Sequence, residues 1–117
     1  MKPRNLFEPN PETRDGEIFE PLAQTGSFRL ERIVSKGHAT PPGTWYDQES
    51  EEWVVLLRGR AGLMFEGETE IHTMEPGDYF LIPSHRRHRV EWTDPAEETI
   101  WLALHWSDDK GHAKPLR

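Results

Sequence analysis

The sequence predicts an all-β sandwich or barrel, and three observations support this prediction. Short runs of apolar and β-branched residues recur along the chain, Gly and Pro turn signals separate them, and no long segment has the period of an amphipathic helix. The length of 117 residues suits one domain with one core. The chain contains no repeat of the propeller or solenoid type.

Composition and charge exclude several classes of function. The chain has 14 Lys and Arg against 21 Asp and Glu, and the formal charge of -7 disfavours nucleic acid and anionic membranes as partners. The absence of cysteine excludes disulfides, thiolate catalysis and Cys-ligated zinc. No apolar run approaches the roughly 20 residues of a membrane span, and the polar start lacks the apolar core of a signal peptide. We therefore expect a cytoplasmic protein.

Residues 1–27 are expected to form an extended N-terminal arm. Pro3, Pro9 and Pro11 lie among charged residues, a composition that disfavours a helix or an interior strand. The arm also carries apolar residues that could dock on a neighbouring subunit, namely Leu6, Phe7, Ile18, Phe19 and Leu22. This pattern predicts a strand exchanged between two copies, and hence a homodimer.

The barrel itself is expected over residues 28–106, followed by a polar tail over 107–117. The segment 28–34 alternates as a half-buried strand does, and the run 53–57 is apolar throughout, which predicts a strand buried on both faces. Further strands, each bounded by turn signals, are expected at 61–66, 79–82, 88–92 and 99–106, with a less regular one at 69–74.

Glu52 is predicted to face the interior of this barrel. It opens the apolar run and shares one strand face with Val54 and Leu56. A buried carboxylate is costly unless a cation, a metal or hydrogen-bond donors receive it. Glu52 is therefore either a site residue or a structural ion-pair partner.

His88 is predicted to point toward the same core. The segment 88–92 alternates strictly, so that His88 shares a face with Val90 and Trp92. Arg89 and Glu91 are expected to point outward.

Two spacings in the chain resemble the two motifs of the cupin superfamily. Glu52, six residues and Gly59 match the end of the first motif, G(X)5HXH(X)3-4E(X)6G. Gly77, Pro83 and His88 match the body of the second, G(X)5PXG(X)2H(X)3N. The resemblance implies a cupin double-stranded β-helix, which is a jelly-roll-like barrel.

The first motif departs from the pattern at its two histidines. Counting back from Glu52 places Tyr46 and Gln48 at those positions, with Trp45 and Asp47 as the alternatives for a shorter spacer.

The resemblance implies a divalent metal ion in the barrel, held by the ligands of the family that this sequence keeps. The resemblance retains Glu52 and His88 of the three histidines and one glutamate that many cupins carry. The amide oxygen of Gln48 could replace one imidazole, and His85, which stands where the second motif has glycine, could supply another nitrogen. Such a mixed set would suit Fe, Mn, Ni or Zn. The alternative is that Glu52 and His88 only hydrogen-bond each other.

Three further residues are candidates for a role at the same cavity. Tyr46 is predicted either to face the cavity as a hydrogen-bond donor or general acid, or to pack at the barrel mouth. His105 shares a strand face with Trp101 and could move protons in the cavity. His38 lies in a loop that could rim the pocket.

Two groups of side chains are candidates for ligand binding. Three tryptophans could line an aromatic pocket, although core packing explains them equally well: Trp45, Trp92 and Trp101. Three arginines would suit a carboxylate or phosphate at a pocket rim, or else form a solvated surface: Arg86, Arg87 and Arg89.

Three functions stay open at this level. The preferred one is a cupin that binds a divalent metal and a small organic molecule inside the barrel, with an anion as one option, and that uses the metal in catalysis if it is an enzyme. The second is a metal-free, sugar-type epimerase, isomerase or dehydratase with a histidine and a tyrosine acting across the cavity. The third is a non-catalytic binding or sensing module.

Overall fold

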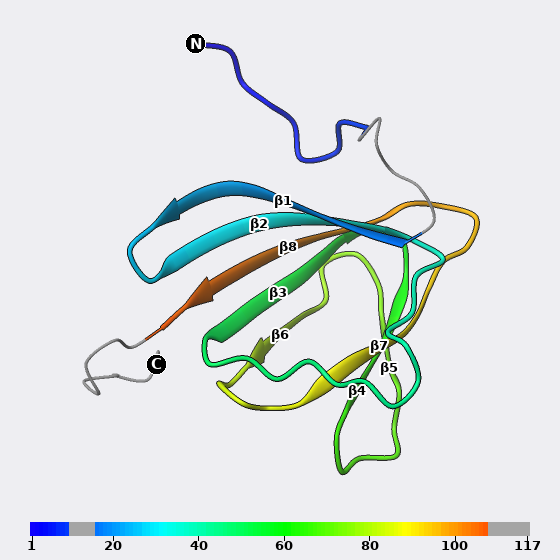
Figure 1. The fold of residues 1–117 in the computed structure, drawn as a ribbon. Helices are drawn as coiled ribbons and strands as arrows, with labels where there is room; N and C mark the ends of the chain where they lie inside the picture. Colours follow the sequence, from blue (N-terminus) through cyan, green and yellow to red (C-terminus); the bar gives the residue numbers. More distant parts are fainter. Residues whose placement is uncertain (10–15, 108–117) are drawn as a thin grey trace.

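Two antiparallel sheets make up the computed structural model, which describes residues 1–9 and 16–107 (Figure 1). The strands are β1 (Gly16–Thr25), β2 (Phe28–Lys36), β3 (Glu51–Arg58), β4 (Ala61–Phe65), β5 (His72–Met74), β6 (Tyr79–Ile82), β7 (His88–Thr93) and β8 (Thr99–Trp106). The larger sheet has the order β1-β2-β8-β3-β6, and the smaller one has the order β5-β4-β7. The predicted all-β fold is confirmed. No helix in the described residues is long and apolar enough to cross a membrane.

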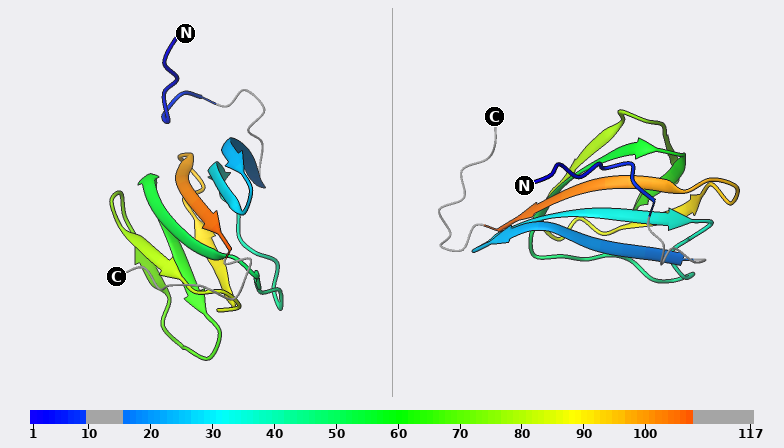
Figure 2. Two further views of the ribbon diagram at one scale, coloured as in Figure 1. Left: turned by 90° about the vertical axis from the view of Figure 1, so that its left-hand side faces the viewer. Right: turned by 90° about the horizontal axis from the view of Figure 1, so that it is seen from above.

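The last strand lies inside the larger sheet, between two strands that precede it in the chain. β8 pairs antiparallel with β2 on one side and with β3 on the other. Figure 2 shows β1, β2 and β8 side by side in both of its views. This order brings residues of β2 and β8, which are far apart in the sequence, onto neighbouring positions of one sheet.

Residues 16–25, which the sequence assigned to the N-terminal arm, form β1 instead. β1 pairs antiparallel with β2 around a turn in which Gly26 has a positive φ of 53°. Pro21 is compatible with this strand because β1 is at the sheet edge and its register shifts between Pro21 and Ala23. The barrel therefore begins before residue 28.

Exchange of a strand between two copies stays a prediction. Residues 10–15 of the predicted arm and residues 108–117 of the predicted polar tail lie outside the described residues.

β3 is buried along its inner face, whereas on its outer face only Val55 is buried. Glu52, Val54 and Leu56 turn toward the space between the sheets and are buried. Trp53, on the opposite face, is only half-buried and lies in a shallow apolar groove on the outside of the sheet. The groove is lined by Phe28, Trp53, Leu81, Leu104 and Trp106. The apolar run of β3 thus serves two different surfaces.

The core fills the space between the two sheets. Its members come from both sheets and are Ile33, Val54, Leu56, Ala61, Leu63, Phe65, Met74, Ile82, Val90, Trp101 and Ala103. Burial of these side chains supplies the main driving force for folding.

Arg32 connects the first residues of the chain to the outer face of β2. Its side chain is only 2% exposed, and its Nε donates to Glu20 at 2.7 Å. Its Nη1 donates to the backbone carbonyls of Leu6 at 3.0 Å and Glu8 at 2.6 Å. The segment 1–9 is therefore held at a defined place by a buried cation.

Candidate functional site

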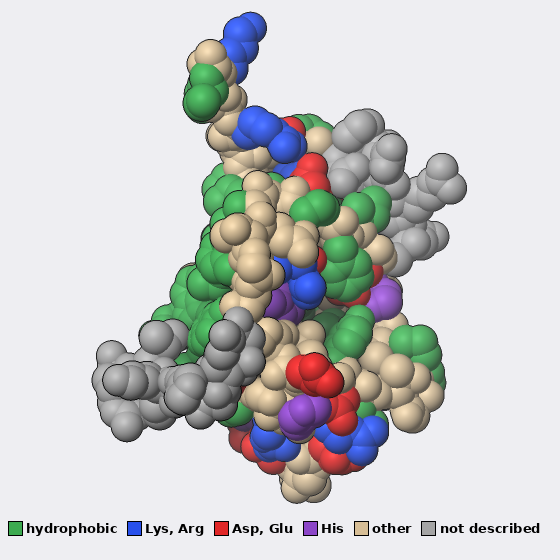
Figure 3. All heavy atoms as spheres, turned by 60° about the vertical axis from the view of Figure 1, so that its left-hand side comes forward, with side chains coloured by type: hydrophobic (Ala, Val, Ile, Leu, Met, Phe, Trp, Pro, Cys, Tyr) green, Lys and Arg blue, Asp and Glu red, His purple; other side chains and the backbone are tan. Residues whose placement is uncertain are grey.

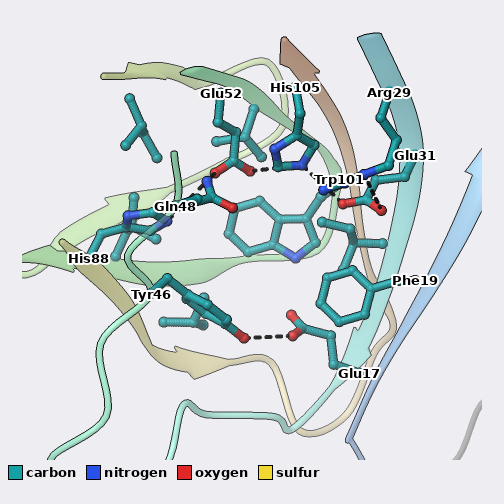
Figure 4. A pocket seen from close by; sticks show the side chains of 15 residues that line it. Glu17, Phe19, Arg29, Glu31, Tyr46, Gln48, Glu52, His88, Trp101 and His105 are labelled. Carbon is teal, nitrogen blue, oxygen red and sulfur yellow. Dashed lines mark hydrogen bonds and ion pairs between the residues drawn. The ribbon is translucent and has the colours of Figure 1, made fainter. Parts of the chain in front are cut away.

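A cavity of about 320 Å³ lies between the two sheets, and its walls come from strands of both. The apolar part of the wall includes Phe19, Ile33, Val54, Leu63, Ile82, Val90 and Trp101. The polar and ionisable part consists of Glu17, Arg29, Glu31, Tyr46, Gln48, Glu52, His88 and His105 (Figure 4). The volume is in the range that holds a small organic molecule.

Glu52 on β3 and His88 on β7 meet in this wall. Both are buried, and Nε2 of His88 lies 3.6 Å from Oε1 of Glu52. Nδ1 of His88 lies 2.8 Å from the carbonyl oxygen of Arg86, so that Nδ1 carries the hydrogen and donates it. Gln48 donates from Nε2 to Oε1 of Glu52 at 2.7 Å. The predicted inward positions of Glu52, His88 and Gln48 are thus present, while their roles stay predictions.

The carboxylate of Glu52 is ionised at neutral pH. Burial by itself raises the pKa of Glu52, but the hydrogen bond of His88, the charges of His105 and His88, and the hydrogen bond of Gln48 outweigh it. The pKa of Glu52 therefore lies below its usual range.

His105 on β8 lies on the cavity wall next to two carboxylates. Its Nε2 is 3.0 Å from Oε1 of Glu31 and 3.9 Å from Oε2 of Glu52. Nε of Arg29 lies 3.6 Å from the other oxygen of Glu31. Because a carboxylate accepts hydrogen bonds, Nε2 of His105 carries a hydrogen, and in the neutral ring Nδ1 holds the lone pair. Nδ1 is buried without a hydrogen-bond partner.

Tyr46 comes from the loop before β3 and enters the cavity on the opposite side from His105 (Figure 4). The loop is fixed next to β7 by two backbone hydrogen bonds between Tyr46 and His88. The hydroxyl of Tyr46 donates to Oε1 of Glu17 at 3.1 Å, and Nε2 of His38 lies 3.5 Å from the same oxygen. Burial, together with the charge of Glu17 and its hydrogen bond, raises the pKa of Tyr46 to about 12. The phenol therefore keeps its proton at neutral pH.

His85 does not join the site, contrary to the sequence prediction. Its side chain is 62% exposed, and its Nδ1 lies 2.8 Å from Oδ1 of Asp47, outside the cavity. The backbone explains this position: His85 has a positive φ of 61° at the place where the second motif usually has glycine. Its backbone N–H donates to the carbonyl of Gln48, and the imidazole is left on the surface.

Of the three tryptophans proposed for the pocket, only Trp101 lines it. Trp45 stacks with Arg89 at 5.8 Å, measured from the guanidinium carbon to the ring centre. Trp92 packs against the backbone of Gly62, where a side chain on Gly62 would clash with the indole.

The three arginines proposed for the rim do not line the cavity either. Arg86 donates to the backbone carbonyl of Glu66 at 2.8 Å, and Arg87 donates to the carboxylate of Glu66 at 2.9 Å. Arg89, which was expected to point into solvent, is 9% exposed because the loop between β2 and β3 covers it. Its guanidinium donates to backbone carbonyls of that loop, including Thr40 at 2.8 Å.

The donor set for a divalent metal does not assemble in residues 1–9 and 16–107. These residues contain no group of three His, Asp or Glu side chains that could hold an ion. Gln48 presents its amide nitrogen to Glu52, and His105 is hydrogen-bonded to Glu31. The residues present therefore do not fit the four-ligand set that the resemblance implied.

Four residues of the cavity wall were missed at the level of sequence, namely Glu17, Phe19, Arg29 and Glu31. Glu17 and Phe19 were missed because β1 was read as part of an arm. Arg29 and Glu31 belong to a strand that was predicted, but their alternation with apolar residues was read as a solvent-facing side. The available signal was the alternating segment 28–36 together with the apolar residues Ile18, Phe19 and Leu22 just before it, with Gly26 between them as a turn residue.

The chain belongs to the cupin family, since the Cupin domain profile matches residues 32–105. A crystal structure of a candidate mannose-6-phosphate isomerase from Ralstonia eutropha JMP134 shares 46% sequence identity over 92% of this chain and 100% of that chain, with a TM-score of 0.87. An RmlC-like cupin from Desulfovibrio desulfuricans superposes with a TM-score of 0.71 at 19% identity, over 91% of this chain and 96% of that chain. No curated protein matches the chain significantly. The predicted cupin barrel is thereby confirmed.

Proposed function

We propose that the cavity binds a small organic molecule and that His105 and Tyr46 move protons on it, as in a sugar-type isomerase, epimerase or dehydratase. One observation carries this proposal: an imidazole and a phenol face the same cavity from opposite sides, each next to its own carboxylate (Figure 4). The 46% identical protein from Ralstonia eutropha, with its description as a candidate mannose-6-phosphate isomerase, supports a reaction of this class.

His105 is suited to act as the general base. Glu31 accepts the hydrogen of Nε2, which leaves a lone pair on Nδ1, and the same carboxylate stabilises the imidazolium that forms when Nδ1 takes a proton. The proton would come from a carbon next to a carbonyl group, since such a carbon is acidic enough for a histidine base.

Tyr46 is suited to act as the acid. Its raised pKa keeps the phenol protonated, and a ligand carbonyl oxygen that replaced Glu17 as the acceptor of this O–H would receive the proton. The electron pair of the broken C–H bond then forms the double bond of an enediol. The imidazolium of His105 then returns a proton to the same or the neighbouring carbon, while the phenolate of Tyr46 takes a proton back from an enediol hydroxyl as the carbonyl re-forms. The product is an epimer or an isomer, and no oxidant or reductant is needed.

The proposal is tested by exchange of carbon-bound hydrogen in D₂O. Five- and six-carbon aldoses and ketoses, each free and as the phosphate ester, would be incubated with the protein and followed by NMR. We expect deuterium to enter at the carbon next to the carbonyl, and His105→Asn and Tyr46→Phe each to lower the exchange rate by about 100-fold or more. His85→Asn is the matched control, because this histidine is exposed and outside the cavity. Exchange that survives His105→Asn unchanged would exclude His105 as the base.

The metal-binding alternative is favoured by the orientation of His88. Because its Nδ1 donates to a backbone carbonyl, Nε2 is the nitrogen that faces Glu52, and these are the two groups that the cupin ligand set retains. We expect protein incubated with Fe(II), Mn(II), Ni(II) or Zn(II) and then desalted to retain well under one ion per chain, because the other two ligands of the usual set are replaced. Elemental analysis measures the retained metal. If the protein instead retained one metal ion per chain, and His88→Asn abolished this retention, the result would support the metal-dependent function.

A further inference from the structure

We infer that the ligand of this cavity is an uncharged, polyhydroxylated compound and not a phosphate ester or another anion. The inference rests on the proposed function in that it concerns the same cavity, but it follows from different observations. These are the charge of the wall, the position of the basic side chains and the hydrogen-bonding groups that have no partner.

The charge of the wall opposes an anionic ligand. Three carboxylates line the cavity, from Glu17, Glu31 and Glu52. Among the described residues, Arg29 is the only Arg or Lys in the wall, and it already faces Glu31 at 3.6 Å. A phosphate group moved into this space loses its hydration and meets like charges at short range, and a single paired guanidinium does not compensate for both losses.

The basic side chains near the barrel mouth are used elsewhere. Arg86 and Arg87 bind Glu66, and Arg89 is buried against backbone carbonyls. On the face drawn in Figure 3, basic side chains lie beside acidic ones at the lower end of the molecule and do not form a separate basic patch. Within residues 1–9 and 16–107, these arginines therefore offer no free cluster of cations to a phosphate.

The indole, the carboxylates and the aromatic rings of the wall suit a ligand rich in hydroxyl groups. Nε1 of Trp101 is buried, has no hydrogen-bond partner, and faces the space between Tyr46 and Glu17 in Figure 4. A buried donor without an acceptor is unfavourable, and a ligand oxygen would satisfy it. The carboxylates of the wall accept hydrogen bonds from hydroxyl groups, and the rings of Phe19, Tyr46 and Trp101 offer apolar faces to carbon-bound hydrogens. This combination of acceptors, a donor and aromatic rings is complementary to a free sugar.

Matched pairs of compounds test the inference by titration calorimetry: mannose and mannose 6-phosphate, fructose and fructose 6-phosphate, ribose and ribose 5-phosphate. We expect each free sugar to bind at least roughly tenfold more tightly than its ester, because the ester must place a dianion near three carboxylates. This preference is measured on the unmodified protein, so that it does not depend on the folding of any variant.

A tryptophan variant tests the role of the indole. Trp101→Phe keeps a ring but removes the N–H, and we expect it to weaken binding of the preferred sugar by roughly tenfold. Trp53→Phe is the matched control, because Trp53 lies on the outer face of the sheet. Melting curves of both variants show that the fold is retained. Equal binding by Trp101→Phe and the unmodified protein would remove Trp101 from the ligand contacts.

The outcomes separate this inference from the proposed function. Equal or tighter binding of the phosphate esters would overturn the inference, while hydrogen exchange on those esters that depends on His105 would leave the proposed function in place. Binding of free sugars without any exchange in D₂O would support the inference and remove the proposed function. Failure of every sugar and every ester to bind would overturn the inference.

Discussion

Glu52 shows most directly how strand alternation predicts which residues face the cavity. It has three polar neighbours in the cavity wall, namely Gln48, His88 and His105. The position of Glu52 on the inner face of β3 follows from the apolar residues two and four places further on, and the position of His88 follows in the same way. The partners of His105 could not be predicted, because Glu31 lies 74 residues away in the sequence and reaches His105 only through the pairing of β2 with β8.

The ionised carboxylate of Glu52 predicts that the stability of the folded protein falls in acid. Since the pKa of Glu52 is lowered on folding, its contribution to stability is fully present above its ordinary pKa of 4.5 and is lost as the pH falls through the lower pKa of the folded state. We expect Glu52→Gln to be less stable than the unmodified protein at neutral pH and to lose less of its stability on acidification. Circular dichroism melting curves from about pH 7 to about pH 3 measure this difference.

Glu49→Gln is the control for this experiment, because Glu49 is exposed. It should follow the unmodified protein at every pH. If Glu52→Gln were as sensitive to acid as the unmodified protein, the buried carboxylate would not be the group that titrates.

At the scale of elements, the sequence predicted the strands from β2 to β8 and missed β1. Alternation or a continuous apolar run, bounded by Gly and Pro turns, is a local signal, and it was clear for all of these strands except β5, where the segment 69–74 is less regular. β1 contains Pro21 and two charged residues, Glu17 and Glu20, which are unfavourable in an interior strand but acceptable at a sheet edge. Whether a strand lies at an edge is decided by the whole sheet and not by its own residues, so local reasoning placed β1 in the arm.

The contact of residues 1–9 with Arg32 on β2 predicts that this side chain holds the segment in place. Arg32 is buried and makes charge-assisted hydrogen bonds to Glu20 and to two backbone carbonyls of the segment. We expect Arg32→Gln to lower the free energy of unfolding by about 2 kcal/mol and to speed proteolytic cleavage within residues 1–9. Urea denaturation and limited proteolysis measure the two effects.

Arg4→Gln provides the matched control for the docking prediction. Arg4 also pairs with Glu20, but its side chain is 63% exposed, and exposed ion pairs contribute little to stability. We expect only a small change in stability and in cleavage rate. If both variants behaved alike, the buried guanidinium would not be what holds the segment.

At the scale of the whole molecule, the resemblance to cupins was sufficient to predict the fold but not to predict the metal-ligand set. The spacing of Glu52 to Gly59 and of Gly77 to His88 led to the family that the profile match confirms. The ligand set implied by the same resemblance is not assembled in the described residues, because His85 is on the surface and Gln48 turns its amide nitrogen to Glu52. Motif spacing is tied to the turns of the barrel, whereas the side chains at the ligand positions can be replaced without changing those turns. The expected homodimer stays a prediction.

The hairpin of β1 and β2 has a consequence for how cupins of this kind are compared. Glu17, Phe19, Arg29 and Glu31 all belong to the cavity wall, yet all four precede residue 32, where the match to the Cupin domain begins. Two proteins could thus agree at every position that defines the family and still accept different molecules, because one upstream hairpin supplies part of the binding surface. Grafting that hairpin from one homologue to another would be a direct way to transfer substrate preference without rebuilding the barrel.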